Sequence, residues 1–582
     1  MGQEISDSEF DAAAFDEFRH RVDEETRLLG EWLADEQLVP SQRRFGFEVE
    51  GWLIDAQARP AARNQEFLEA LDDPMVVPEL ARFNFEINSD PAPLSEGVFD
   101  RIHDALLTRW RHCEEAAGRL GLRPLMTGIL PTVRSCDLSL AQMSPLQRYR
   151  AINDQVFRLR RGRPIELDIR GVEQLTHRHD DVMLEAGTTS LQIHVQVDSE
   201  EAARAFNVCK MISAVTVGAA ANSPFLFGRR LWQETRVPLF EQAVSVGASE
   251  YSQRVTFGIA YAKKSILECF EDNRIWYPVI LPDLIDAPAE ELAHLRLHNG
   301  TIWRWNRPLI GFNAQGEPHC RIEHRVVAAG PTPVDAIANT ALFLGLFEAL
   351  MRSPEPLESL LPFAVARDNF YAAARHGLGA EVCWLGGACG GLGELLSTRL
   401  GAAYLERVGI PTDWVDAREI LVSSSRANRG HSRNYLSATC EHAPDGGLQA
   451  RLAGPGKVVL TQGFIARNPQ GETVLLGRGG SDTSAAYMAA KLQARRLEIW
   501  TYVPGMFTAN PHVVPSARLL VALHFDEAQE LASAAGLPQV MASDEFWGRA
   551  PGTPGEDKTV AYLIEQMQEI GLQPGGTGGR WI

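Results

Sequence analysis

Residues 47–50 read Phe-Glu-Val-Glu, and this alternation of apolar and polar side chains recurs in three later segments. The later segments are residues 84–88 (Asn-Phe-Glu-Ile-Asn), 191–194 (Leu-Gln-Ile-His) and 321–325 (Arg-Ile-Glu-His-Arg). A period of two is typical of a strand with one face on a core and the other facing a cavity or solvent. We therefore expect four strands, each with its polar side chains on one face.

Glu48 and Glu50 share such a face, and carboxylates placed together repel each other unless a cation lies between them. Mg²⁺ prefers oxygen ligands and often also holds the phosphates of a nucleotide. Arg321 and Arg325 lie on the same predicted face as Glu323, where they would add positive charge suited to phosphate transfer. The alternative is a set of solvated sheet faces with incidental charges.

Size and composition limit the possible functions. A chain of 582 residues exceeds what one hydrophobic core usually supports, so two or more domains are expected. The net charge of −19 argues against a nucleic-acid surface and fits an enzyme that acts on small molecules. We expect no membrane span and no secretion signal, although the first residues formally fit N-myristoylation. The eight cysteines form no CxxC pair, which predicts reduced thiols in a cytoplasmic protein. The sequence leaves the oligomeric state open.

The first part of the chain mixes strands and helices without regular βαβ alternation, which predicts an α+β fold with a mainly antiparallel sheet. The expected helices are 8–35, 95–120, one that starts at 144, 199–221, 333–352 and 365–377. The expected strands are 45–54, 83–88, 124–129, 189–197, 254–260, 301–312 and 319–327. Residues 177–181 (His-Arg-His-Asp-Asp) resemble a metal cluster, but no helix or strand is expected there, so we predict a loop.

The pattern changes after the glycine cluster at residues 386–391 and becomes a regular α/β alternation. The expected elements are a helix at 395–408, strands at 414–416, 458–466 and 497–501, and a helix at 481–494. Near residue 541 the chain becomes rich in Pro and Gly around one helix. We therefore predict three domains, at residues 1–387, 388–540 and 541–582, the last of them loosely ordered.

Further landmarks occur in a fixed order among the acidic segments. They are residues 126–132 (Met-Thr-Gly-Ile-Leu-Pro-Thr), 143–145 (Met-Ser-Pro), 221–225 (Ala-Asn-Ser-Pro-Phe) and 298–303 (His-Asn-Gly-Thr-Ile-Trp). With them, residues 8–386 resemble the glutamate–cysteine ligase family of bacteria and plants. That resemblance implies a cup-shaped sheet with ATP, Mg²⁺ and glutamate on its concave face. It also implies a reaction in which ATP phosphorylates the γ-carboxylate of glutamate and the amino group of cysteine attacks the acyl phosphate.

The resemblance also implies roles for individual residues. The metal ligands would be Glu48, Glu50, Glu86, Gln192 and Glu323, with Glu79 as a further acidic ligand. The catalytic pair would be Glu323, which bridges toward ATP, and Arg325, which lies beside the transferred phosphate. Independently of the resemblance, we expect contacts to substrate carboxylates or ATP phosphates from Arg321, His194, Arg236, Arg304 and Arg307. The last three could equally be surface arginines, His194 a hydrogen-bonded cavity histidine, and Glu50 and Glu79 surface acids.

Residues 475–485 (Leu-Leu-Gly-Arg-Gly-Gly-Ser-Asp-Thr-Ser-Ala) form a glycine-rich turn that opens a helix, an arrangement that can bind phosphate. Around them, residues 393–540 resemble aspartate kinases of the amino-acid kinase family. The implied nucleotide loop consists of Gly477, Gly479, Gly480, Ser481, Asp482 and Thr483. We expect this loop to be vestigial, because the family's Lys-Phe-Gly-Gly-Thr loop has no counterpart here and Tyr502 stands where Asp is usual.

Residues 543–582 resemble the start of zinc-dependent aminopeptidases, without the metal ligands of that family. The leading hypothesis is an ATP-dependent ligase that joins glutamate to cysteine, with small molecules as its substrates and without a nucleic-acid or membrane partner. The alternatives are a ligase for another amine, an aspartate kinase and an inactive fusion product.

Overall fold

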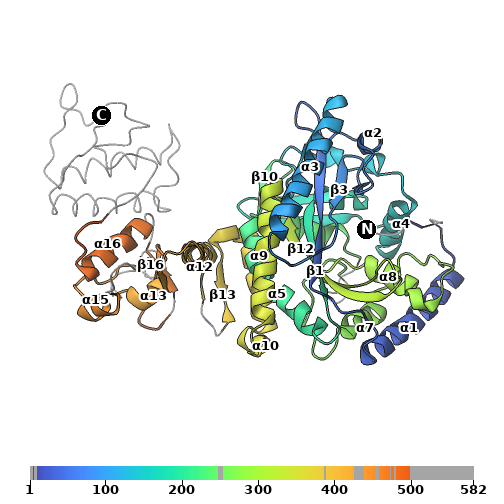
Figure 1. Ribbon diagram of the computed structural model, residues 1–582. Coiled ribbons are helices and arrows are strands. Elements are labelled where there is room, and N and C mark those ends of the chain that lie inside the picture. The colour runs from blue at the N-terminus through green and yellow to red at the C-terminus, as the bar shows by residue number, and fades with distance from the viewer. Residues whose placement is uncertain are drawn as a thin grey trace, which may run out of the picture. The chain divides into compact units, whose positions relative to one another are not determined.

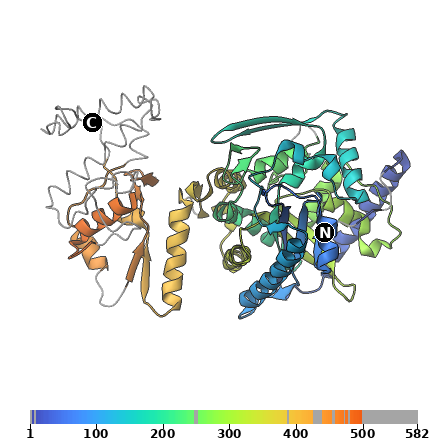
Figure 2. The same cartoon turned by 90° about the horizontal axis from the view of Figure 1, so that it is seen from above.

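The structure is a computed structural model that describes residues 4–5, 9–246, 253–385, 389–424, 438–452, 458–471, 473–476 and 480–497. The chain divides into two compact units, residues 1–495 and 496–582. Nearly all described residues belong to the first unit (Figures 1 and 2). Tyr502, the expected strand at 497–501 and the aminopeptidase-like segment 543–582 lie wholly or almost wholly outside the described residues.

An eight-stranded curled sheet organises the N-terminal part of the chain (Figure 1). Its main path runs β11-β12-β8-β1-β3-β2, every pair is antiparallel, and β4 and β5 pair with β1. The strands are β1 (Arg44–Ile54), β2 (Val76–Pro78), β3 (Asn84–Asn88), β4 (Ala92–Pro93), β5 (Arg123–Leu125), β8 (Ser190–Val197), β11 (Asn306–Phe312) and β12 (Pro318–Ala328). The predicted α+β class and mainly antiparallel sheet are confirmed.

Alternation along β1 separates the core from the opposite face of the sheet. The apolar side chains of Phe45, Phe47 and Val49 are buried. Glu48, which lies between Phe47 and Val49, and Glu50, which follows Val49, are only partly buried. Gly51 allows a close approach to β3, because a Cβ atom there would lie 2.6 Å from the Phe85 ring. The core therefore fixes the face on which the carboxylates lie.

Two groups of helices pack with this sheet (Figures 1 and 2). The first contains the almost wholly buried α5 (Ala202–Ala220), which contacts β12, α9 and α11. Its other members are α3 (Val98–Arg119), α9 (Pro333–Met351) and α11 (Phe363–His376). The second contains α1 (Ala12–Ala34), α7 (Leu267–Trp276) and α8 (Ala293–Gly300), with α1 in contact with both others. These spans agree with the expected helices at 8–35, 95–120, 199–221, 333–352 and 365–377.

The remaining elements of this part are short. They include α2 (Asn64–Leu71), α4 (Gln147–Leu159), α6 (Arg236–Ala243), α10 (Leu357–Leu360), β6 (Ile165–Arg170), β7 (Gln174–His179), β9 (Phe225–Leu226), β10 (Arg229–Arg230), β13 (Glu381–Cys383), β14 (Cys389–Gly391) and the 3-10 turn η3 (Val182–Gly187). Among the described helices, α9 alone is long and apolar enough to cross a membrane by length and composition. Its Phe343 and Phe347 side chains are fully buried in the core.

Three predictions are wrong. Residues 177–179 belong to strand β7, because Gln174–His179 pairs along its whole length with β6, whose alternating Ile165, Leu167 and Ile169 are buried. Residues 254–260 form no strand among the residues described there. Instead of a strand, this segment carries the buried Arg254, whose guanidinium donates hydrogen bonds to the Thr301 and Pro278 carbonyl groups. The thiols are not all reduced, because Cys383 is disulfide-bonded.

The kinase-like part is a separate α/β arrangement with its own small core, which includes Val415, Leu421 and Val474. Strand β15 (Thr412–Val415) pairs in parallel with β16 (Val458–Thr461), and β17 (Ile465–Arg467) pairs antiparallel with β18 (Thr473–Leu475). Its helices are α12 (Leu392–Arg407), α13 (Ala417–Ile420), α15 (Gly446–Leu452) and α16 (Gly480–Leu492). The single strand expected at 458–466 is thus two strands. Gly480, Ser481, Asp482 and Thr483 begin α16, whereas Gly477 and Gly479 lie outside the described residues.

Candidate functional site

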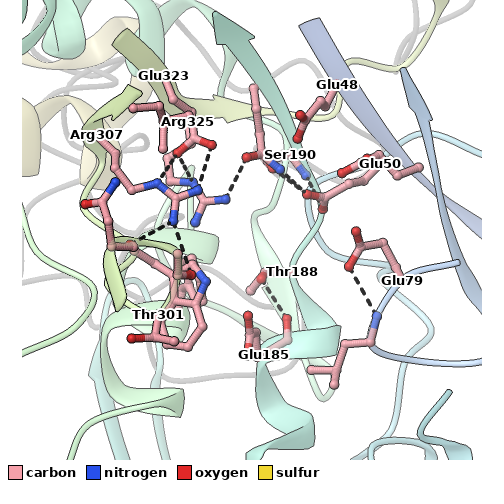
Figure 3. A pocket seen from close by; sticks show the side chains of 18 of the residues that line it. Glu48, Glu50, Glu79, Glu185, Thr188, Ser190, Thr301, Arg307, Glu323 and Arg325 are labelled. Carbon is pink, nitrogen blue, oxygen red and sulfur yellow. Dashed lines mark hydrogen bonds and ion pairs between the residues drawn. The ribbon is translucent and has the colours of Figure 1, made fainter. Parts of the chain in front are cut away.

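A cavity of about 270 Å³ lies at the polar side of the sheet, and side chains from β1, β3, β8, β11 and β12 line it (Figure 3). The predicted residues it brings together are Glu48, Glu50, Glu79, Glu86, Gln192, His194, Arg236, Arg307, Arg321, Glu323 and Arg325. Strand register explains this convergence. Glu48 lies opposite Gln192, and Glu50 lies opposite Glu86.

The carboxylates on β1 and β3 form the acidic side of the cavity. The Glu50 carboxylate accepts hydrogen bonds from the Ser190 amide, the Ser190 hydroxyl and the Gln192 amide, each at 2.8 Å. Burial, followed by the charge of Glu79, raises the pKa of Glu50 to about 7. Burial and the neighbouring Glu48 and Glu79 raise the pKa of Glu86 well above its usual range. A bound cation would remove this repulsion, so the site fits a metal on chemical grounds.

His194 lies between two carboxylates. Its Nε2 atom is 3.4 Å from Glu48 Oε1 and 4.0 Å from Glu323 Oε1. Neither ring nitrogen has a hydrogen-bond partner within the part of the chain that the structure describes. Burial lowers the pKa of His194 to about 4, so the ring is neutral near pH 7 and able to bind a metal. One ligand atom from each of these three residues lies within 4.8 Å of the others, a spacing that could hold one ion.

Arginines on β11 and β12 form the basic side of the cavity (Figure 3). The Arg307 guanidinium donates two hydrogen bonds of 2.9 Å to the Glu323 carboxylate. Arg325 donates to Gln192 Oε1 at 2.6 Å and lies 3.3 Å from Glu323 Oε2. Burial opposes ionisation of Glu323, but Arg307 and Arg325 outweigh it and hold the pKa of this carboxyl well below its usual range. Arg321 completes the group, and its Nε atom is buried without a hydrogen-bond partner among the described residues.

Two predicted substrate contacts lie elsewhere or are already engaged. Arg304 is absent from the cavity lining; its guanidinium donates to Asn273 Oδ1 at 2.5 Å and lies 5.3 Å from the centre of the Tyr277 ring. Arg236 borders the cavity, but its guanidinium forms an ion pair of 3.0 Å with buried Glu234. The guanidinium groups of both arginines therefore bind side chains of this protein, and we do not propose them as substrate contacts.

The sequence interpretation missed several lining residues. They include Asn84 on β3, Arg148 and Tyr149 on α4, Glu185 on η3, and Arg296, Thr301 and Trp303 in and after α8. Burial and the charge of Glu79 raise the pKa of Glu185 to about 8. Except for Asn84, these residues lie on helices or in loops, where a period of two carries no information about the direction of a side chain. Two landmark segments give a positional signal, because residues 298–303 contain Thr301 and Trp303, and residues 143–145 shortly precede Arg148 and Tyr149.

Comparison with known proteins divides the chain into two overlapping segments. Residues 44–406 match the family model "Glutamate-cysteine ligase family 2", and residues 343–543 match the amino acid kinase family. The cavity residues Glu48 to Arg325 all lie within the first match.

Curated relatives match the second segment. The bifunctional aspartokinase/homoserine dehydrogenase 2 of Escherichia coli is 43% identical over 142 residues, which are 24% of this chain and 17% of that protein. The lysine-sensitive aspartokinase 3 of E. coli is 38% identical over 141 residues, which are 24% of this chain and 30% of that protein. The chain therefore spans less than a third of the length of either relative.

Two solved structures are similar to parts of this chain. E. coli aspartokinase III in complex with aspartate and ADP has a TM-score of 0.22 at 29% identity, over 35% of this chain and 39% of that chain. Glutamate–cysteine ligase from Francisella tularensis in complex with AMP has a TM-score of 0.39 at 13% identity, over 60% of this chain and 74% of that chain. The family model covers more than half of the sequence, and on that match the chain belongs to the glutamate-cysteine ligase family 2.

Proposed function

We propose that residues 1–387 form an ATP- and Mg²⁺-dependent ligase that joins the γ-carboxylate of glutamate to the amino group of cysteine. Family membership supports the reaction class. The observation that carries the proposal is the position of Glu323, which shares one side of the cavity with a possible metal site and with two guanidinium groups. Phosphoryl transfer between anions needs this kind of charge neutralisation.

Among the described residues, the ligand atoms of Glu48, His194 and Glu323 lie close enough to hold one divalent cation. Glu50, Glu79 and Glu86 line the same cavity and would be the ligands of a second ion, with Gln192 beside Glu48 and Glu50. Mg²⁺ would neutralise the phosphates of ATP and the carboxylates around it. Since Glu48 and Glu50 alternate with buried residues of β1, the sheet positions the ligands of both ions together.

Two steps complete the proposed reaction. A γ-carboxylate oxygen of glutamate attacks the γ-phosphorus of ATP, and ADP leaves. The amine nitrogen then attacks the acyl carbon, phosphate leaves, and the nitrogen loses one proton. Arg307, Arg321 and Arg325 would bind the phosphoryl oxygens and exclude water from the acyl phosphate. With cysteine as the amine, this is the first step of glutathione synthesis, carried out in the cytoplasm on small-molecule substrates.

One assay separates this proposal from its alternatives. ATP turnover by the purified chain is measured with glutamate plus cysteine, with glutamate plus a panel of other amines, and with aspartate alone. We expect turnover to require glutamate and to fall by at least about 10²-fold in Glu323→Gln. The matched control is Glu317→Gln, which changes an exposed carboxylate on the same hairpin.

Each other outcome points to a different function. Turnover with glutamate and a different amine would reassign the acceptor. Turnover with aspartate that survives Glu323→Gln would place the activity in the kinase-like segment, which the aspartokinase relatives make the second candidate. Absence of turnover with every substrate would contradict the ligase and leave an inactive fusion product.

A further inference from the structure

Strand β12 contains a β-bulge beside the cavity. His324 lies opposite Ile193 and Val327 lies opposite Leu191, so three steps along β12 correspond to two steps along β8. The extra residue lies in the stretch that includes Arg325. Bulges interrupt a hydrogen-bond ladder and redirect side chains, and they occur frequently beside active sites.

The backbone of this bulge is held by a side chain from another part of the chain. The Arg236 guanidinium donates from Nη1 to the Arg325 carbonyl oxygen at 3.2 Å and from Nη2 to the Val326 carbonyl oxygen. Buried carbonyl groups that leave a ladder need another donor, and one guanidinium supplies both hydrogen bonds. Arg236 therefore stabilises the irregular backbone of β12 directly.

Arg236 is itself fixed on its other side. It is 2% exposed, and its Nε atom lies 3.0 Å from Oε1 of Glu234, a carboxylate with no exposed surface. The Glu234 carboxylate also accepts a hydrogen bond of 2.9 Å from the Asn222 amide. The Arg236 guanidinium carbon lies 5.2 Å from the centre of the Trp305 ring, and the Trp305 carbonyl accepts the Arg325 amide at 3.0 Å. These contacts define one orientation of the guanidinium.

Arg325 lies within the bulge, on the stretch of β12 whose backbone Arg236 holds. Its guanidinium donates to Gln192 and contacts Glu323, while Nη1 has no hydrogen-bond partner among the described residues and the side chain lines the cavity. We propose that Glu234 and Arg236 are positioning residues that orient Arg325 toward the transferred phosphoryl group. This proposal rests on the proposed function. It gives Arg236 a role through the backbone of β12, in place of the substrate contact that the sequence predicted.

A double-mutant cycle tests this inference. Arg236→Lys keeps the positive charge, but its ammonium group cannot donate to Glu234 and to the Arg325 and Val326 carbonyl groups in the same geometry. Glu234→Gln keeps the shape of the side chain but removes the negative charge that pairs with Arg236. We expect each change to lower kcat by about 10–100-fold with little change in KM for ATP, glutamate or the amine, because only the orientation of a group used in the transition state is lost. In an Arg325→Lys background, the same changes should have almost no further effect on kcat.

Arg204→Lys is the matched control, because Arg204 also donates to two backbone carbonyls, those of Leu350 and Ser353, away from the cavity. A rise in KM for glutamate or ATP at unchanged kcat would show that Arg236 binds substrate directly and would overturn the inference. A full additional loss of kcat in the Arg325→Lys background would also overturn it.

Crystal structures of the full chain and of Arg236→Lys provide an arm that needs no activity. The expected result is a displaced Arg325 guanidinium with changed hydrogen bonding at Val326. An unchanged Arg325 would refute the positioning role. Absence of glutamate-dependent turnover in the unaltered chain would contradict the proposed function alone, and the crystal structures would still decide whether Arg236 orients Arg325.

Discussion

Replacing Glu323 by glutamine should destabilise the fold as well as abolish activity. Glu323 is 2% exposed and its carboxylate contacts two guanidinium groups, with both oxygens bonded to Arg307 at 2.9 Å and one of them 3.3 Å from Arg325. The amide keeps one acceptor for Arg307 but removes the negative charge. Two buried guanidinium groups then lie beside each other without the charged carboxylate that both contact.

Removing one partner of a buried ion pair typically costs 3–5 kcal/mol, and the retained hydrogen bond places Glu323→Gln near the lower end, at about 3 kcal/mol. The measurement is a urea titration followed by tryptophan fluorescence, in buffer with EDTA and without nucleotide. The urea concentration at the midpoint should be lower for Glu323→Gln, while the slope of the free energy of unfolding against urea concentration stays the same. Glu317→Gln should unfold at the midpoint of the unaltered chain, because that side chain is exposed.

The difference in the free energy of unfolding between the unaltered chain and Glu323→Gln should change with pH in one direction. The arginines hold the pKa of Glu323 below its usual range in the folded state, so the folded protein binds fewer protons there than the unfolded chain. The stabilisation is complete above the unfolded pKa of about 4.3 and is lost as the pH falls through the folded pKa. The difference between the two proteins should be constant from about pH 8 to 5 and shrink below about pH 4.

Two results would refute this reasoning. Equal urea midpoints at pH 7 would mean that Glu323 contributes no net stability to the folded state. A difference that grows as the pH falls would mean that the carboxyl is protonated in the folded state, contrary to its contacts with Arg307 and Arg325.

Three further predictions concern other positions. Gly51→Ala should lower stability by about 1–3 kcal/mol in the same titration, because the new Cβ atom would lie 2.6 Å from the Phe85 ring; an unchanged midpoint would contradict this close approach. Burial lowers the pKa of Lys210 to about 7, so the folded state disfavours the ammonium form of this side chain. The free energy of unfolding of Lys210→Met, relative to that of the unaltered chain, should therefore be greatest below about pH 7 and decline toward pH 10. A difference that does not depend on pH would show that the pKa of Lys210 is the same in the folded and unfolded states. His194→Ala should weaken Mn²⁺ binding by at least about tenfold in a titration of free Mn²⁺ by electron paramagnetic resonance, and unchanged affinity would remove His194 from the ligands.

Side-chain alternation predicted the part of the site that lies on the sheet. Glu48, Glu86, Gln192 and Glu323 were predicted from four separate segments, and strand register brings them to one cavity. These side chains share one cavity because a strand has only two faces, and the buried residues between these positions fix which face meets the core.

The sequence could not predict what the arginines contact. Arg304 and Arg307 are three residues apart, yet the first binds Asn273 outside the cavity lining and the second binds Glu323 within it. Their difference depends on the positions of α7 and β12, which no local pattern specifies. The same holds for Arg148 and Glu185, whose place in the cavity depends on how α4 and η3 pack.

The β12 bulge also has an evolutionary consequence. Since β12 carries one more residue than β8 between the pairs at His324 and Val327, loss of a single codon there would restore a regular ladder. Such a deletion would remove the irregular backbone whose Arg325 and Val326 carbonyl groups accept hydrogen bonds from Arg236. Loss of one codon would therefore take from Arg236 the backbone that it holds, although the side chains of residues 321, 323 and 325 would still share one face of the strand.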